Sequence, residues 1–300
     1  MSDTYSQRQM MLSFAYLAYI GEPLVGIPSP DSTIATELEN AMTSTANPTI
    51  PPIAGLWSVI WGPVSYTVPG SYFQDNMMYV AKLSDTSGPS QYAVAVRGTV
   101  SAAPLDWLLD DFDIFRMMPW PLGTSSSGAG PQISESTSIG LATLLNMVDV
   151  ASQQTLFEFL SSEMAAPCIS AASVCFTGHS LGATLASTLA LYARQNQSSW
   201  DSNSKAAVTT VNFAGPTAGN AEFAALFDQV FDSSTSTANA DCVRNSLDVV
   251  PLAWNVTTLG QVESIYLGHS IHDILPPLGT AEIIRAIVNA TSAKNYTRIG

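Results

Sequence analysis

This sequence contains few charged residues, and basic residues are especially scarce. Only 11% of its 300 residues are Asp, Glu, Lys or Arg, and 24 acidic residues against 10 basic ones leave a formal net charge of −14. Because nucleic-acid binding depends largely on contacts of Lys and Arg with phosphate, we expect no nucleic-acid partner. The same charge disfavours an anionic membrane surface, whereas a neutral lipid or oil interface remains compatible with it.

Cysteines are also few, and no hydrophobic run is long enough to cross a bilayer. Cys168, Cys175 and Cys242 allow at most one disulfide bond, so stability has to come from a hydrophobic core. Hydrophobic residues make up 46% of the chain, which is ample for such a core. The apolar run at 10–20 is too short to span a membrane and lacks the features of a signal peptide, so we predict that it forms a docking helix.

Strand-like and helix-like apolar patterns alternate along the rest of the chain. Strands are predicted at 77–83, 91–98, 173–178, 207–215 and 241–247, and helices at 139–160, 181–195 and 221–231. Such alternation predicts an α/β fold with a mostly parallel central sheet and helices on both faces. We expect residues 1–300 to form a single domain, in which residues 1–55 contribute an N-terminal helix and a wrapping segment.

The pentapeptide Gly178-His179-Ser180-Leu181-Gly182 lies between a predicted strand and a predicted helix. Glycines two positions before and after a serine remove the Cβ atoms that would collide in a sharp strand–helix turn. The serine then stands at a helix N-terminus, which favours negative charge, and the N–H of Leu181 can point at a developing oxyanion. A capping serine in a glycine-rich turn is the alternative, but the context favours Ser180 as a nucleophile.

A nucleophilic serine needs a base, and the base needs an orienting acid; in this type of sheet they follow in the order Ser, Asp or Glu, His. Asp248, just past a predicted strand, is the predicted acid, with a turn or cap aspartate as the alternative. His179 adjoins the nucleophile and should point away from the base position. His269, which follows a glycine after a strand-like run, is the predicted base. His272, or a base outside this chain, remains an alternative, as do two loop histidines without chemistry.

The second oxyanion donor should come from the end of an earlier strand. The run AVAVRGTV ends at Gly98 and Thr99, and the N–H and hydroxyl of Thr99 are suited to this role. The segment HSIHD at 269–273 offers two imidazoles and a carboxylate but no further clear ligand, so we do not expect a metal site there. None of these groups requires a cofactor.

Several segments together resemble the class 3 lipase family of α/β-hydrolases. They are AVRGT (95–99), DWLLDDF (106–112), TGHSLGATLA (177–186), NFAGPTAGN (212–220) and RNSLDVVP (244–251), in family order. LWSVIWGPV (56–64) and STSIGLATLLNM (136–147) resemble a branch of microbial and fungal lipase-like proteins. The resemblance implies an α/β-hydrolase fold, with Ser180 as nucleophile, Asp248 as triad acid, and Thr99 with Leu181 as oxyanion hole. The sequence departs from the family at Ala183, where a second glycine is usual, and in its short spacing from acid to histidine.

An oily segment follows the predicted oxyanion residue. Within it, Leu105, Leu108, Leu109 and Phe112 form a helical stripe, while four aspartates fall largely elsewhere. Such a stripe is typical of a core, but its position and the resemblance favour a lid over 100–123 that swings away at an oil surface. For the aspartates, a solvated acidic face is a better interpretation than a divalent cation site.

These observations predict a serine hydrolase that cleaves carboxylic esters, and most specifically a triacylglycerol lipase. Phospholipase A1 and a general or aromatic-acid carboxylesterase are the alternatives among enzymes. A catalytically silent lipid-binding hydrolase fold is the alternative from another class. The expected partners are an ester or lipid molecule and a transient lipid interface at the lid, and secretion is slightly favoured as the location although we expect no signal peptide in this chain.

Overall fold

The computed structural model describes residues 5–21, 31–45, 50–67, 74–84, 87–98, 116–123, 130–232, 239–261, 291–292 and 294–299. Its helices are α1 (Gln7–Leu17), α2 (Asp31–Thr43), α4 (Glu135–Asn146), α5 (Leu156–Ala165), α6 (Leu181–Gln195), α7 (Gln197–Trp200), α8 (Ala221–Phe231) and α9 (Val256–Leu259). Its strands are β1 (Trp57–Thr67), β2 (Gln74–Leu83), β3 (Ser90–Val96), β4 (Met117–Pro119), β5 (Gln132–Ser134), β6 (Ala172–His179), β7 (Ala206–Phe213), β8 (Gly219–Asn220), β9 (Ala240–Val243) and β10 (Tyr296–Thr297).

The main sheet has the strand order β1-β2-β3-β6-β7-β9. The pairs β1–β2 and β2–β3 are antiparallel, whereas β3–β6, β6–β7 and β7–β9 are parallel. The predicted α/β fold with a mostly parallel sheet is therefore confirmed. The parallel strands β3, β6, β7 and β9 end at the same edge of the sheet, and there β6 lies between β3 and β7.

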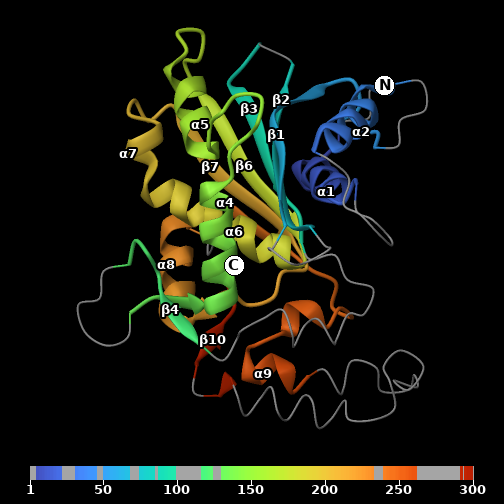
Figure 1. Ribbon diagram of the computed structural model, residues 1–300. Coiled ribbons are helices and arrows are strands. Elements are labelled where there is room, and N and C mark those ends of the chain that lie inside the picture. The colour runs from blue at the N-terminus through green and yellow to red at the C-terminus, as the bar shows by residue number, and fades with distance from the viewer. Residues whose placement is uncertain are drawn as a thin grey trace.

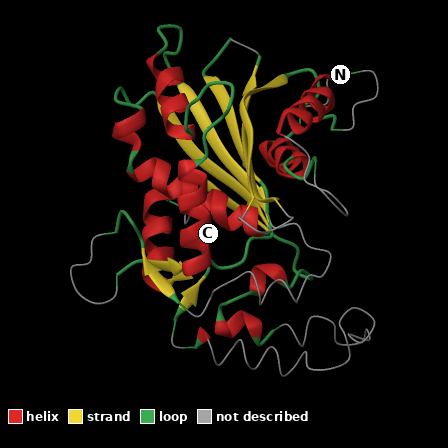
Figure 2. Ribbon diagram, in the orientation of Figure 1, coloured by secondary structure: helices red, strands yellow, loops and turns green. Residues whose placement is uncertain are grey.

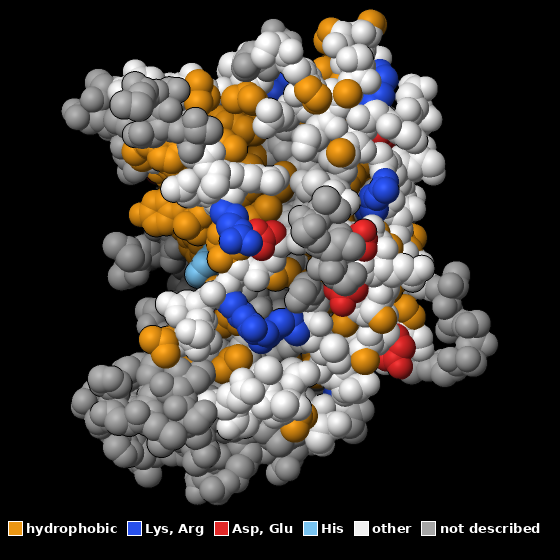
Figure 3. Space-filling model, turned by 180° about the vertical axis from the view of Figure 1, so that it is seen from behind, with side chains coloured by type: hydrophobic (Ala, Val, Ile, Leu, Met, Phe, Trp, Pro, Cys, Tyr) orange, Lys and Arg blue, Asp and Glu red, His pale blue; other side chains and the backbone are white. Residues whose placement is uncertain are grey.

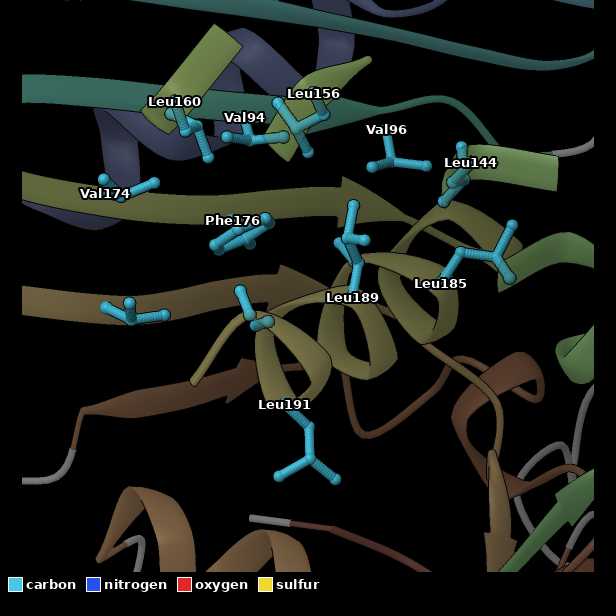
Figure 4. Close-up of a cluster of buried hydrophobic side chains, with 14 of the residues drawn as sticks. Val94, Val96, Leu144, Leu156, Leu160, Val174, Phe176, Leu185, Leu189 and Leu191 are labelled. Atoms are coloured by element: carbon cyan, nitrogen blue, oxygen red, sulfur yellow. The ribbon is translucent and has the colours of Figure 1, made fainter. Parts of the chain in front are cut away.

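Helices cover both faces of this sheet, as the sequence predicts (Figures 1 and 2). Side chains alternate between the faces along each strand, so neighbouring strand residues belong to different cores. One core packs α1 and α2 against the sheet; the other packs α4, α5, α6 and α8 against it. In Figure 4 the second core includes the labelled side chains Val94, Val96, Val174 and Phe176 from the strands and Leu144, Leu156, Leu160, Leu185 and Leu189 from the helices.

The helix predicted at 139–160 is wrong as a single element. The structure has α4 and α5 instead, separated by a turn in which Val148 and Thr155 form an isolated bridge. Asp149 accepts a hydrogen bond from the N–H of Ser152 at 2.7 Å, and Gln153 has a φ of 57°. These local contacts favour a turn over a continuous helix, although the apolar spacing runs through it.

A second, smaller sheet has the order β10-β8-β5-β4. Its strand β4 (Met117–Pro119) lies in residues 116–123, the end of the predicted lid. Trp120 there is buried, donates from Nε1 to Gln195 Oε1 at 2.7 Å and packs edge-on against Phe223. This end of the oily segment belongs to the packed fold, so the lid prediction is kept only for 100–115, which lie outside the described residues.

The docking helix predicted at 10–20 is confirmed as α1, which begins at a Ser6–Gln9 capping box. All three cysteines are free thiols, so the one disulfide bond that the sequence would allow is not formed. Burial raises the pKa of Cys175 to about 11 and that of Cys242 to about 12. Both thiols therefore stay protonated at neutral pH, which makes them poor nucleophiles.

Charged side chains are spread thinly over the surface. Figure 3 shows a few groups of basic and acidic side chains on the rear face. Wide uncharged areas lie between these groups. An ion pair between Arg8 and Asp241 ties α1 to β9. In the described part of the chain, no helix is long and apolar enough to cross a membrane.

Candidate functional site

Ser180 occupies a strained turn between β6 and α6. Its φ of 58° and ψ of −129° lie outside the regions that L-residues normally adopt, and such a conformation costs on the order of 1–3 kcal/mol. Its side chain makes no capping hydrogen bond to the helix, so the capping alternative is wrong. The residue is 8% exposed. Ser180 therefore stands in a strained turn at the N-terminus of α6, and its role as the nucleophile stays a prediction.

The turn is held by backbone hydrogen bonds to the neighbouring strand. The N–H of Ser180 donates to the carbonyl of Phe213 at 3.0 Å, and the N–H of Ala183 donates to the carbonyl of Ser180 at 3.0 Å. The N–H of Leu181, as the first residue of α6, has no acceptor within the helix. Its role as an oxyanion donor stays a prediction.

The two elbow glycines are required because backbone approaches them closely. A Cβ on Gly178 would collide with the carbonyl of Gly182, and a Cβ on Gly182 would collide with the carbonyl of Val96 and lie 2.7 Å from the nitrogen of Gly98. The start of α6 is thus packed directly against the end of β3. This contact brings the start of α6 next to Gly98, the last described residue before Thr99.

We expect Gly182→Ala to be destabilising and to lower ester hydrolysis. The added Cβ has to push α6 away from the end of β3, and overpacking of this kind costs about 1–3 kcal/mol of unfolding free energy. Urea denaturation and initial rates on a soluble ester measure the two effects. The matched control is Gly88→Ala, where a Cβ meets nothing within 4 Å and stability should change by less than about 0.5 kcal/mol. Equal stability of the two variants would contradict the steric argument.

Asp248 lies in the loop that follows β9, next to the strand that supports the elbow. Ala214, directly after β7, donates its N–H to the carbonyl of Val243 at the end of β9. The Asp248 carboxylate is half-buried and accepts the N–H of Val250 through Oδ1 at 3.0 Å. It also lies close enough to His179 to raise the pKa of that imidazole. The predicted acid is therefore near the elbow and anchored in its loop.

His179 is directed toward the N-terminal part of the chain. Its Nδ1 lies 3.1 Å from the hydroxyl of Tyr19, and the two rings pack edge to face at 5.9 Å. Its pKa lies below the ordinary value because surrounding protein atoms remove part of the ring from solvent; the charge of Asp248 partly offsets this. The residue as a whole is exposed. His179 therefore contacts the N-terminal segment, and that it is not the base stays a prediction.

Several predicted site residues lie outside the described residues: Thr99, His269 and His272, together with the four aspartates of the oily segment. Two polar residues beside the elbow were missed by the sequence analysis. Arg97 is completely buried at the end of β3, and Tyr19 contacts the elbow itself. An arginine that ends an apolar strand was a usable signal for the first; a lone tyrosine in a helical run gave none for the second.

A cavity of about 130 Å³ lies beside α6. Thr184, Asn212, Pro251 and Arg298 are among the described residues that line it. The described residues contain no group of three or more His, Cys, Asp or Glu side chains that could hold a metal ion.

Comparison with known proteins relates the chain to one family. The family described as Lipase (class 3) matches residues 93–257. The crystal structure of M37 lipase is 35% identical, with 98% of this chain and 83% of that chain covered and a TM-score of 0.85. The LIP2 lipase of Yarrowia lipolytica is 18% identical (81% and 72% covered, TM-score 0.51), and lipase II of Rhizopus niveus is 15% identical (84% and 76% covered, TM-score 0.55). These two share the fold, and the comparison with curated proteins found no match.

Proposed function

The chain belongs to the class 3 lipase family and is a carboxylic ester hydrolase, and we propose that it is a triacylglycerol lipase that acts through a triad of Ser180, His269 and Asp248. The single observation that carries this proposal is the strained turn at Ser180. A non-glycine residue with a φ of 58° and a ψ of −129°, placed between a buried strand and a helix N-terminus, is strained, and its side chain makes no capping bond that would explain the conformation. The conformation is explained if the hydroxyl has to project as a nucleophile.

In this proposal His269 takes the proton of the Ser180 hydroxyl as the oxygen attacks the ester carbonyl. Asp248 holds the imidazole in the required tautomer and stabilises the imidazolium that forms. The N–H of Leu181, at the positive end of the α6 dipole, and Thr99 then stabilise the tetrahedral oxyanion. Each such donor lowers the barrier by about 3 kcal/mol.

Collapse of this intermediate releases the alcohol, which takes its proton from the imidazolium, and leaves Ser180 acylated. Water then attacks the acyl-enzyme with the same imidazole as base, so the carboxylic acid leaves and the serine is regenerated. Every proton in the cycle moves between the hydroxyl, the imidazole, the alcohol and water. The scheme uses no cofactor.

The lid belongs to the proposal for residues 100–115. Their sequence carries an apolar stripe directly after the proposed oxyanion residue, and an oil surface would bind that stripe in place of the protein. Such a lid predicts that activity rises when substrate forms an emulsion. A carboxylesterase for soluble esters would show no such rise.

Two measurements test the proposal. A fluorophosphonate probe should label the protein once, with the adduct on the peptide that contains Ser180, and labelling should abolish ester hydrolysis. A series of acyl-chain lengths, with and without emulsion, should show a preference for long chains in emulsified triacylglycerol. Failure to label would favour a lipid-binding fold without catalysis, and a flat preference for soluble short esters would favour a carboxylesterase. Faster release of acid from phospholipid would favour a phospholipase A1.

A further inference from the structure

The turn that follows α1 reaches the elbow from the face of the sheet opposite to α6 (Figure 1). Two side chains of the sheet hold α1 in place through its backbone. The hydroxyl of Tyr79 donates to the carbonyl of Phe14 at 2.8 Å, and that of Thr177 donates to the carbonyl of Met11 at 3.2 Å. The helix is thus anchored to β2 and β6, so the position of Tyr19, two residues beyond it, is determined by the sheet.

The hydroxyl of Tyr19 makes two contacts with His179. It donates to the backbone carbonyl at 3.3 Å and lies 3.1 Å from Nδ1 of the imidazole. Because a tyrosine hydroxyl has one hydrogen, a donation to the carbonyl requires that Nδ1 carries a proton and donates to the tyrosine oxygen. Donation to the carbonyl therefore goes with the Nδ1–H tautomer of neutral His179, whereas donation to Nδ1 goes with the Nε2–H tautomer.

The carbonyl that Tyr19 binds belongs to the peptide unit that immediately precedes Ser180. The N–H of the same unit donates to the carbonyl of Phe213 at 3.0 Å. Both polar ends of this peptide plane are therefore fixed, one by the N-terminal segment and the other by β7. A strained residue persists only where its surroundings determine its conformation in this way.

The same hydroxyl also lies against the end of β3. A Cβ on Gly98 would be 2.7 Å from the tyrosine oxygen and 2.6 Å from the carbonyl of His179. Gly98 directly precedes Thr99, the proposed oxyanion residue. The tyrosine oxygen thus stands between the elbow and the segment that leads to the second oxyanion donor.

We propose that Tyr19 is a positioning residue of the ester-hydrolysis site. By binding the carbonyl before Ser180 and packing against Gly98, its hydroxyl sets the separation of the nucleophile from the segment that leads to Thr99. The proposal rests on the hydrolase mechanism above. It gives the N-terminal helix a role in the transition state: a small displacement of these donors weakens oxyanion stabilisation while substrate binding is retained.

The test compares Tyr19→Phe with Tyr16→Phe. Tyr19→Phe keeps the ring and removes the hydroxyl, whereas Tyr16 lies in α1, three residues earlier, and is 66% exposed. On a soluble short-chain ester, Tyr19→Phe should lower kcat by about 10- to 100-fold, with KM within about twofold and an unchanged melting temperature. Nitrogen-15 NMR of the histidines should show the Nδ1–H tautomer of His179 in the wild type and loss of that preference in Tyr19→Phe. Tyr16→Phe should match the wild type in every measurement.

The outcomes separate this proposal from the mechanism on which it rests. If the wild type labels with the fluorophosphonate but Tyr19→Phe retains kcat, or raises KM alone, the positioning role is overturned. Tyr19→Phe could instead lower both kcat and the melting temperature without changing the His179 tautomer. That result also overturns the positioning role, because Tyr19 would then act only on stability. If the wild type does not label, the hydrolase mechanism fails, and the catalytic role of Tyr19 fails with it.

Discussion

Replacing Ser180 with alanine is expected to lower kcat for a p-nitrophenyl ester by about 10⁶-fold, to near the level given by the oxyanion hole and binding alone. The change removes only the attacking oxygen. Alanine has to adopt the same backbone conformation as serine, so the strain at φ 58° persists, and the hydroxyl makes no capping bond whose loss would weaken α6. Unfolding free energy should therefore stay within about 0.5 kcal/mol of the wild type. Steady-state rates and urea denaturation of the purified variant measure both effects.

The matched control is Ser187→Ala, one to two turns further along the same helix. The hydroxyl of Ser187 is buried and accepts a hydrogen bond from Asn212 Nδ2 at 2.8 Å. Its loss should cost about 1 kcal/mol of stability and leave the fluorophosphonate adduct unchanged. Ser180→Ala should therefore lose activity and keep its stability, whereas Ser187→Ala should lose stability and keep its labelling. Retained turnover in Ser180→Ala, or an adduct on another residue, would reject Ser180 as the nucleophile.

The elements that the sequence predicts best are those determined by local pattern. Helix α6 has the predicted bounds because the elbow motif around Ser180 and Gly182 marks its start, and an apolar stripe continues to its last turn. The elbow was predicted for the same reason, since five consecutive residues carry its steric requirement. The helix predicted at 139–160 failed because apolar spacing alone does not detect the turn around Asp149, which polar contacts with neighbouring residues stabilise.

Contacts between distant parts of the chain had no local signal. Strands β4, β5, β8 and β10 are only two or three residues long, which is too short to show the alternating apolar pattern of a strand. They form because the small sheet pairs segments from three regions of the sequence. The contact between Tyr19 and His179 spans 160 residues. Its existence depends on how α1 crosses the sheet, which no window of sequence contains. Local motifs in the sequence therefore suggest candidate groups for the chemistry, but they do not reveal the long-range contacts that hold the elbow.

Asp248 is the predicted acid of the triad, and its substitution tests that role. Asp248→Asn should reduce kcat by about 10⁴-fold at neutral pH, because the amide presents the wrong hydrogen-bonding partner and favours the wrong tautomer of the catalytic imidazole. The loop itself should persist: the asparagine oxygen can still accept the N–H of Val250, and Arg298 still donates to the carbonyl of Pro251 at 3.0 Å. Rates on a soluble ester, with thermal unfolding as a check on the fold, measure the effect. The same assay on His269→Ala and His272→Ala separates the two candidate bases.

Asp241→Asn is the control, because Asp241 lies on β9 just before the same loop and pairs with the exposed Arg8. Asp241→Asn removes one negative charge and an ion pair at the surface. It does not change the proposed partner of the catalytic imidazole, so kcat should be unaffected. The comparison separates a specific role of Asp248 from a general effect of charge in a strongly acidic protein. If both variants lose activity equally, the effect is electrostatic at long range and Asp248 is not the orienting acid. If neither does, the acid of this site lies elsewhere in the chain, and the short spacing between Asp248 and His269 ceases to matter.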